Sequence, residues 1–141
     1  MWSPDFQNRL RDWSDLRRRC QGLDLESALL EINQWWSQTP WRPYYLHWDD
    51  HQSWPDPWSL LADNVFCDVA RALGILYTIE LLDRSDVTDL ELAQCFAGNL
   101  VLVNKGKYIL NWNTGQVLNI SSNIPTITRT LDRDKLSSLI G

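Results

Sequence analysis

Residues 100–120 read LVLVNKGKYILNWNTGQVLNI, and this stretch decides the fold of the chain. Three short runs of aliphatic and aromatic residues, a composition that favours strands, occupy Leu100–Val103, Lys107–Trp112 and Val117–Ile120. Between them lie Asn104-Lys105-Gly106 and Asn113-Thr114-Gly115, which carry the Asn and Gly typical of hairpin turns. The stretch therefore predicts a three-stranded antiparallel meander.

The first 36 residues predict a helical hairpin. Ser3-Pro4 is typical of a helix start, because Ser can cap the helix and Pro suits its first position. Gly22 is expected to end this helix and Asp24 to cap a second one. Apolar residues then recur at helical spacing along one face of each helix: Phe6, Leu10, Trp13 and Leu16 in the first, and Leu25, Ala28, Leu29, Ile32, Trp35 and Trp36 in the second.

The middle of the chain changes character. Residues 37–57 hold four prolines and five aromatic residues, and we expect an ordered loop there with one short strand at Tyr44–Trp48. Asp56-Pro57 predicts the start of a third helix, which continues directly or after a break at Asn64. Residues 75–82 fit a strand and a helix equally well, because period alone does not settle short apolar runs.

Helices that precede strands predict an α+β fold, with a helical hairpin and a core helix packed on a small antiparallel sheet. We expect one domain over residues 1–141: the hairpin in 1–36, the loop in 37–57, and the core helix plus meander in 58–141. Thr126–Thr130 fits an added edge strand and Asp132–Ile140 a closing helix.

Composition narrows the class of protein without giving its function. The chain of 141 residues has the size of one ordinary domain, and its net charge of −5 argues against nucleic-acid binding. No apolar run reaches the roughly 18–20 residues of a membrane span, and the N-terminus lacks the features of a signal peptide. Cys20, Cys67 and Cys95 lack CxxC spacing, which excludes a disulfide scaffold and a four-cysteine zinc site. We expect reduced thiols, with an intermolecular disulfide left open.

Tryptophan is concentrated near the N-terminus, with eight of nine in the first 58 residues. Residues 1–70 carry 11 acidic and 6 basic side chains, and residues 71–141 carry 7 of each, so all the net charge lies in the Trp-rich half. Every cation before Lys105 is an arginine. Trp and Arg are enriched at interface hot spots, whereas Lys is depleted there. A docking surface and a tryptophan-filled core are the two interpretations.

The segment Asn64-Val65-Phe66-Cys67-Asp68-Val69-Ala70 places a cysteine at the start of a predicted helix, where the helix dipole favours a thiolate. A helix that begins at Cys67, carries Ala70 and then Gly74-Ile75, and is followed by strands resembles the core of transglutaminase-like and papain-like folds. This resemblance implies that Cys67 is a nucleophile, with a His and an Asp supplied by the strands after it.

The chain departs from that pattern because no histidine follows His51. The position implied for the His falls near Tyr108 or Asn111, neither of which can act as the base. A working site would need His47 or His51 to supply the imidazole from upstream. An inactive relative, or a buried cysteine that acts as a small hydrophobe, is the alternative.

The segment His47-Trp48-Asp49-Asp50-His51 contains ligand types that suit a divalent metal. Side chains four residues apart converge on a helix, whereas this segment lies among prolines. A hydrogen-bonded loop is therefore favoured, and we expect no metal and no cofactor. Aromatic rings beside Asp, Asn and Gln also suit a carbohydrate-binding module, although such stacking platforms normally lie on a flat sheet face.

Several segments resemble small proteins encoded among the tail, neck and baseplate genes of tailed bacteriophages. They are Trp35-Trp36, Pro40-Trp41, residues 45–50 (YLHWDD), 54–61 (WPDPWSLL), 67–75 (CDVARALGI) and 107–112 (KYILNW). The resemblance implies a structural virion subunit of the tail or baseplate, with a place in the tail or neck region of the particle. Its partners would be other virion proteins and copies of itself, with no nucleic acid and no membrane.

On this interpretation the chain is not an enzyme and docks through a Trp/Arg-rich surface. The expected interface residues are Trp35, Trp36, Trp41, Arg42, Trp48, Trp54 and Trp58. Two functions of other classes remain as alternatives: a Cys67-dependent hydrolase or acyl transferase of the transglutaminase-like kind, and a carbohydrate-binding module.

Overall fold

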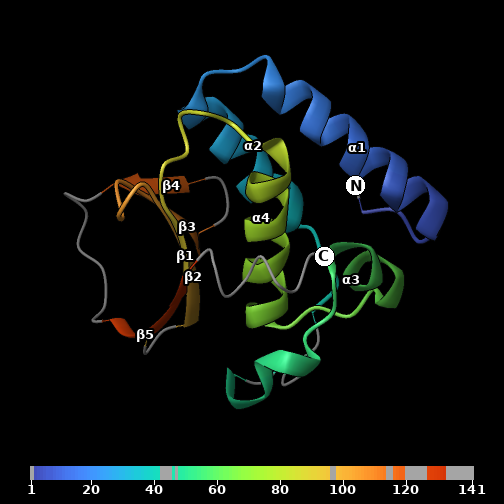
Figure 1. The fold of residues 1–141 in the computed structure, drawn as a ribbon. Helices are drawn as coiled ribbons and strands as arrows, with labels where there is room; N and C mark the ends of the chain where they lie inside the picture. The colour runs from blue at the N-terminus through green and yellow to red at the C-terminus, as the bar shows by residue number, and fades with distance from the viewer. Residues whose placement is uncertain are drawn as a thin grey trace.

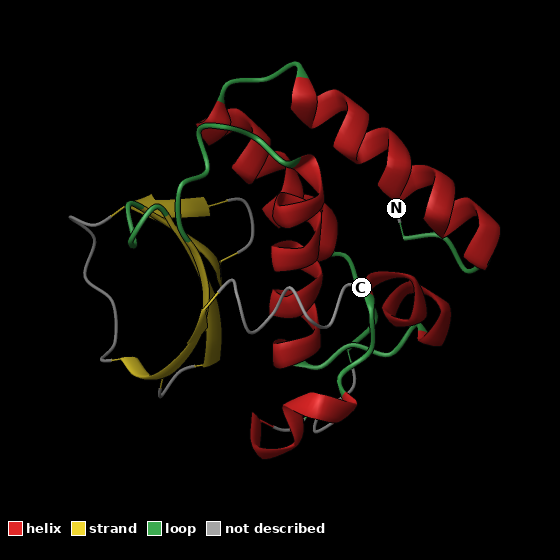
Figure 2. Cartoon of the chain, in the orientation of Figure 1, coloured by secondary structure: helices red, strands yellow, loops and turns green. Residues whose placement is uncertain are grey.

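The computed structural model describes residues 2–41, 46, 48–95, 98–113, 116–119 and 127–132, with only the backbone described at 49, 51, 52, 112, 113 and 116–119. The described helices are α1 (Phe6–Gln21), α2 (Leu25–Trp36), the short 3-10 helix η1 (Trp48–Ser53), α3 (Pro57–Asp63) and α4 (Asp68–Leu82). The described strands are β1 (Leu90–Cys95), β2 (Gly98–Val103), β3 (Tyr108–Asn113), β4 (Gln116–Asn119) and β5 (Ile127–Asp132). Helices therefore precede strands, and the fold is α+β as predicted (Figure 2).

The strands form one antiparallel sheet in the order β4-β3-β2-β1-β5. The predicted meander corresponds to β2, β3 and β4, but the sheet is larger than the three strands expected. β1 was missed by the sequence analysis, and β5 pairs with β1 at the opposite edge from β4. The closing helix predicted for Asp132–Ile140 lies beyond the described residues, apart from Asp132 in β5.

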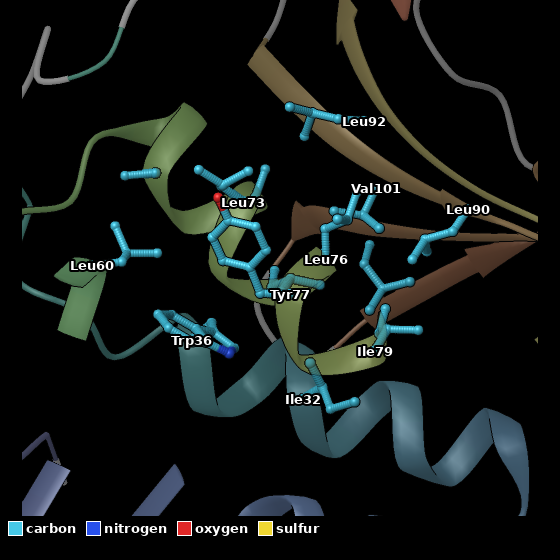
Figure 3. Close-up of a cluster of buried hydrophobic side chains, with 14 of the residues drawn as sticks. Ile32, Trp36, Leu60, Leu73, Leu76, Tyr77, Ile79, Leu90, Leu92 and Val101 are labelled. Atoms are coloured by element: carbon cyan, nitrogen blue, oxygen red, sulfur yellow. The ribbon is translucent and has the colours of Figure 1, made fainter. Parts of the chain in front are cut away.

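Helices α4 and α2 lie on one face of the sheet, and α1 and α3 pack on the side of these helices away from the strands (Figure 1). The main core fills the space between α4 and the sheet, where Leu76 and Ile79 approach Leu90 and Val101 (Figure 3). Alternate residues of the strands, including Ala93, face the opposite way and form a second, small apolar cluster. The arrangement places the N-terminus of α4 against the sheet.

The helical hairpin is present, with a later start than predicted. α1 begins at Phe6 with Asp5 in the capping position, and the Ser3 hydroxyl accepts a hydrogen bond from the Asp5 backbone N–H at 3.2 Å. Gly22 ends α1 as expected. The Asp24 carboxylate caps α2 by accepting a hydrogen bond from the Ser27 backbone N–H at 3.2 Å.

Residues 75–82 are helical and complete α4. Gly74 allows α4 to pack closely against α2, because the six-membered ring of Trp36 lies directly on it. A Cβ at this position would be 2.5 Å from Trp36 Cζ3. The ambiguity at residues 75–82 is thus resolved by a tertiary contact. The absence of a side chain at Gly74 lets α2 and α4 approach closely, which outweighs the low helix propensity of glycine.

The loop predicted for residues 37–57 is only partly described. Trp48 begins η1 and does not end a strand; the remainder of the Tyr44–Trp48 prediction lies mostly outside the described residues. Asp56 caps α3 as predicted, accepting a hydrogen bond from the Ser59 backbone N–H at 2.7 Å. Among the described residues, no helix combines the length and apolarity that a membrane span requires.

The expected docking surface is wrong for three of its members. Trp36, Trp48 and Trp54 belong to the core and are only 1%, 7% and 5% exposed, so they cannot serve as surface anchors. Their burial follows from close edge-to-face packing of aromatic rings, as between Trp48 and Trp54, whose ring centroids are 5.9 Å apart. Trp35 is partly buried against the core, whereas Trp41 and Trp58 are exposed. Arg42 lies outside the described residues.

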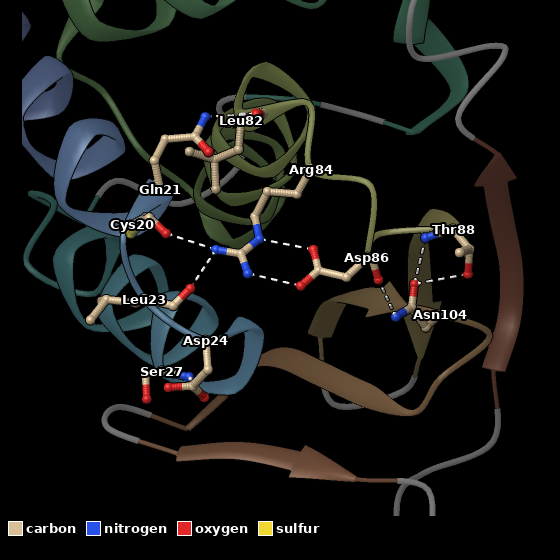
Figure 4. Close-up of polar contacts among 10 residues, drawn as sticks. All are labelled: Cys20, Gln21, Leu23, Asp24, Ser27, Leu82, Arg84, Asp86, Thr88 and Asn104. Atoms are coloured by element: carbon tan, nitrogen blue, oxygen red, sulfur yellow. Dashed lines mark hydrogen bonds and ion pairs between the residues drawn. The ribbon is translucent and has the colours of Figure 1, made fainter.

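A polar cluster lies just beyond the C-terminal end of α4 (Figure 4). The Arg84 guanidinium donates to the carbonyls of Cys20 and Leu23 at 2.8 and 2.7 Å and forms a two-pronged ion pair with Asp86. Asn104 in turn donates to the Asp86 carbonyl at 2.9 Å. Arg84 therefore ties the turn between α1 and α2 to the connection between α4 and β1.

Candidate active site

Cys67 is the N-cap of α4, so the sequence-based position at a helix start is confirmed. The preceding Phe66 is fully buried and its backbone forms a parallel bridge with Trp41. The Cys67 thiol is nearly buried, with the residue 4% exposed, and its sulfur accepts a hydrogen bond from the Leu46 backbone N–H at 3.4 Å. The fold thus fixes this thiol at the positive end of a helix of 15 residues.

Asp68, the first residue of α4, ties the helix to the start of β2. Its carboxylate accepts hydrogen bonds from the Asn99 backbone N–H and, at 3.0 Å, from the Asn99 side-chain amide. The contact is close because Gly98 has no side chain: a Cβ there would lie 2.6 Å from Asp68 Oδ2. The side-chain oxygen of Asn99 accepts a hydrogen bond from the Trp48 indole N–H, which fixes the amide orientation.

Asn111 on β3 completes the cluster. Its side-chain amide donates to the Asn99 carbonyl at 2.8 Å and to Asp68 Oδ1 at 3.2 Å, and its backbone adopts a left-handed conformation with φ of 66°. The Asn111 backbone N–H donates a hydrogen bond to the side-chain oxygen of Asn33 in α2 at 2.9 Å. Residues from α4, β2 and β3 therefore meet in one hydrogen-bonded group next to Cys67.

The chemistry open to this group is defined by its partners. The Asp68 carboxylate is engaged by two asparagine side chains, which orients it as a hydrogen-bond acceptor. An amide has no basic nitrogen, so neither Asn99 nor Asn111 can take the proton of a thiol. The first-turn N–H groups of α4 have no partners within the helix, and they form the natural place for a developing oxyanion.

The histidines that the site would need are both upstream of α3. His47 lies outside the described residues, and only the backbone of His51 is described. The two sequence neighbours of His47 nevertheless contact the cluster, since Leu46 reaches Cys67 and Trp48 reaches Asn99. The two described neighbours of position 47 therefore both contact the site.

The other two cysteines differ from Cys67 in their surroundings. All three thiols are free and buried. Burial, with a smaller contribution from Glu31, raises the pKa of Cys20 to about 11, which keeps this thiol protonated near neutral pH. Cys95 ends β1 and belongs to the small apolar cluster on the opposite face of the sheet. Neither of these two begins a helix.

The described residues contain no group of three or more potential metal ligands. Of the proposed ligand segment, Asp50 is exposed and accepts a hydrogen bond from the Ser53 hydroxyl at 2.7 Å, a local loop contact. The side chains of the two histidines and of Asp49 are outside the description, so the expectation of no metal stays a prediction.

Cys67 is predictable from the sequence, whereas Asn99 is not and Asn111 is predicted only as an approximate position. Asn99 follows a short connection whose only sequence feature is Gly98, and no motif distinguishes it. Tyr108, the other approximate position, is partly buried against the main core and does not join the cluster. The packing of β2 and β3 against the start of α4 decides which strand residues reach Asp68, and that packing is a tertiary property.

Comparisons with known proteins bear on the fold. No protein-family model matches the chain, and no curated protein matches its sequence. A solved structure that is similar is LapG from Legionella pneumophila, with a TM-score of 0.65 and 15% sequence identity over 85% of this chain and 71% of LapG. LapG is a cysteine protease of transglutaminase-like fold. At this identity the similarity establishes the fold alone.

The comparison corrects the expectation that the chain is not an enzyme, because the similar structure belongs to a cysteine protease. The transglutaminase-like resemblance of the Cys67 helix is supported at the level of fold. Nothing in the comparisons supports a phage virion protein, so that role stays a prediction from sequence. The fold of this chain therefore resembles that of LapG.

Proposed function

We propose that this protein is a cysteine-dependent hydrolase or acyl transferase of the transglutaminase-like kind, with Cys67 as the nucleophile. The observation that carries the proposal is the placement of Cys67 as N-cap of α4, directly before Asp68, which bonds to Asn99 of β2 and Asn111 of β3. The similarity to LapG supports the same assignment. A helix N-terminus stabilises a thiolate, which is the reactive form of cysteine.

The reaction would proceed through a thioester. A base removes the thiol proton, the Cys67 sulfur bonds to the carbonyl carbon of an amide, and a first-turn N–H of α4 stabilises the resulting oxyanion. The C–N bond then breaks, and the nitrogen leaves as an amine with a proton returned by the base. Water or a second amine next attacks the thioester, gives up a proton, and releases the acid or the new amide together with the free thiol.

Asp68, Asn99 and Asn111 act in this proposal as positioning residues. They hold the start of α4 against the sheet and keep the sulfur at the helix end. The base is assigned to His47, because the residues on both sides of it contact the cluster and no histidine follows position 51. His51, farther along the segment, serves as its matched control.

Thiol reactivity provides the first test, and the chain supplies a good internal control. Cys95 is 5% exposed and Cys67 is 4% exposed, so their burial is nearly equal and their helix positions differ. We expect iodoacetamide at pH 7 to modify Cys67 about tenfold faster than Cys95 in the intact protein, measured by peptide mass spectrometry over time. Equal rates for the two cysteines would show that Cys67 is a structural thiol.

Catalysis is tested with a peptide library in the presence of cadaverine, scored for new peptide termini and for amine incorporation. We expect turnover by the wild type, none by Cys67→Ser, and a loss of at least about 100-fold for His47→Ala but not for His51→Ala. Turnover that survives Cys67→Ser, or its absence from the folded wild type across the library, would refute the proposed function.

A further inference from the structure

Arg71 is a half-buried cation on α4 without a carboxylate partner among the described residues. Its Nε donates to the Thr39 hydroxyl at 3.0 Å and its Nη2 to the Thr39 carbonyl at 3.4 Å. No partner for Nη1 is found in the described part of the chain. The charge of the nearby Asp68 carboxylate acts on this guanidinium, but the hydrogen bonds of that carboxylate go to Asn99 and Asn111.

Arg71 is also close to the proposed nucleophile. It follows Cys67 by four residues, so both lie on one face of α4, separated by about 6 Å along the helix axis. The Arg71 backbone N–H donates to the Cys67 carbonyl at 3.0 Å, which makes this the first turn of the helix. The backbone of Arg71 therefore lies one helical turn from that of Cys67, and the charge of Cys67 acts on the guanidinium.

An exposed ring stands beside this cation. Trp41 is 59% exposed, and the Arg71 guanidinium carbon lies 5.6 Å from the centre of that ring. The Trp41 backbone bridges to Phe66, the residue directly before Cys67. Trp41 thus contacts both Arg71 and the start of α4, and it presents a large surface to solvent at the same place.

We propose that Arg71 and Trp41 form an acidic-side-chain subsite, so that the acyl substrate of Cys67 is a peptide with a Glu or Asp close to the attacked carbonyl. This inference rests on the proposed function and deepens it. One helical turn corresponds to one or two residues of an extended peptide, at about 3.3–3.6 Å per residue. A bound carboxylate would form the ion pair that Arg71 does not make with the described residues, and its methylene groups would pack against Trp41.

Electrostatics support this assignment. Burial lowers the pKa of Arg71, and the charges of Asp68 and Cys67 counter that effect. Desolvation thus disfavours the Arg71 charge, and a substrate carboxylate at bonding distance would stabilise it. The overall charge of −5 repels acidic peptides in general, so a local cation is needed to admit one to this site.

The test compares two alkylating reagents of similar size in a Cys20→Ser/Cys95→Ser background. Iodoacetate carries a carboxylate and iodoacetamide does not, so the ratio of their rates at Cys67 reports an anion subsite. We expect Arg71→Gln to lower that ratio roughly three- to tenfold, Arg71→Lys to lower it less, and Arg18→Gln to leave it unchanged. Arg18 is a matched charge control because its side chain is 77% exposed and pairs with Asp15 in α1.

The outcomes separate the two proposals. If Cys67 reacts with neither reagent faster than Cys95 does in the wild-type protein, the proposed function fails. If it reacts quickly with iodoacetamide while Arg71→Gln leaves the ratio unchanged, only the acidic subsite is refuted. Thermal melts of the Arg71 variants are run in parallel, and Arg71→Lys keeps the test valid if loss of the Thr39 contacts destabilises the Gln variant.

A peptide arm identifies the source of the carboxylate. Acetylated and amidated peptides that differ only by Glu or Gln are tested for protection of Cys67 from iodoacetamide. We expect the Glu peptide to protect at a concentration at least about fivefold lower than the Gln peptide, and Arg71→Gln to remove the difference. A third peptide carries Gln and a free C-terminal carboxylate. Protection by this peptide alone would overturn the side-chain assignment.

Discussion

At the scale of single residues, the candidate site depends on a close approach between the Gly98 backbone and the Asp68 carboxylate. Gly98 and Asp68 come together because no Cβ lies between them. This contact lets the Asp68 carboxylate accept hydrogen bonds from the backbone and side-chain amides of Asn99. Asn111 reaches the same carboxylate from a left-handed backbone conformation, which Asn tolerates better than most residues. The positions of three polar side chains thus follow from two unusual backbone conformations.

This dependence gives a stability prediction for Gly98→Ala. The substitution places a Cβ 2.6 Å from Asp68 Oδ2 in a backbone with φ of 151°. Gly106→Ala is the matched control, because its φ of 81° is also positive but its Cβ would meet nothing within 4 Å. We expect Gly106→Ala to cost about 1 kcal/mol and Gly98→Ala about 3 kcal/mol of unfolding free energy in urea titrations. Equal costs would mean that the contact with Asp68 is unimportant.

The sequence could predict Cys67 but not the cluster around it. A cysteine between a buried run and a helical pattern is visible locally, because the helix start is encoded within a few residues. Asn99 and Asn111 acquire their roles only through strand register, and an asparagine in a strand is otherwise unremarkable. The exposed Trp41 and the buried Trp48 likewise share a residue type but not an environment, so composition alone misplaced Trp48 on a surface.

At the scale of elements, α4 is held by hydrogen bonds as well as by apolar packing. The hydroxyl of Thr78 accepts hydrogen bonds from the indole N–H groups of Trp13 at 2.8 Å and Trp36 at 2.9 Å, and it donates to the Gly74 carbonyl. Thr78 is completely buried. One hydroxyl therefore joins α1, α2 and α4 at the centre of the helical layer.

Replacing Thr78 tests this junction. Thr78→Val keeps the shape of the side chain but leaves two buried indole N–H groups without an acceptor, and we expect a loss of about 3 kcal/mol in unfolding free energy. Thr78→Ser keeps the hydroxyl and loses one methyl group, so its expected cost is about 1 kcal/mol. Denaturant titrations followed by tryptophan fluorescence measure both variants. A Val variant as stable as the Ser variant would contradict the role assigned to this hydroxyl.

The elements also show where sequence patterns stop being informative. The meander was predictable because three short runs of aliphatic and aromatic residues are separated by typical turn residues in one continuous stretch. Strand β1 reads LELAQC, a composition that favours a helix, and it becomes a strand because β2 and β5 flank it on both sides. The opposite holds for α4: the sequence of its apolar C-terminal half fits a strand as well as a helix, and the packing of Trp36 on Gly74 accompanies the helical form.

At the scale of the whole molecule, Arg84 connects segments that are about 60 residues apart in the sequence. Its bonds to the Cys20 and Leu23 carbonyls span 64 and 61 positions, and its pairing with Asp86 fixes the chain where α4 leads into β1. The Asp86 side chain is 46% exposed, so the ion pair itself contributes little, whereas the bonds from Arg84 to the two carbonyls hold the helical layer to the sheet.

This pair predicts a specific dependence of stability on pH. The hydrogen bond and the charge of Arg84 lower the pKa of Asp86 below its usual value of 3.8. A carboxyl with a lowered folded-state pKa stabilises the fold above its unfolded-state pKa, and this contribution is lost as the pH falls through the folded-state value. We therefore expect Asp86→Asn to lower the unfolding free energy by about 0.5 kcal/mol at pH 7, with the difference from wild type shrinking as the pH falls below the usual value of 3.8. Thermal melts of both proteins from pH 7 to pH 2.5 measure it, with Asp83→Asn, which changes the charge at the end of α4 without this ion pair, as the control. A difference between wild type and Asp86→Asn that persists at the lowest pH would show that Asp86 acts through packing, because a protonated carboxyl no longer forms an ion pair with Arg84.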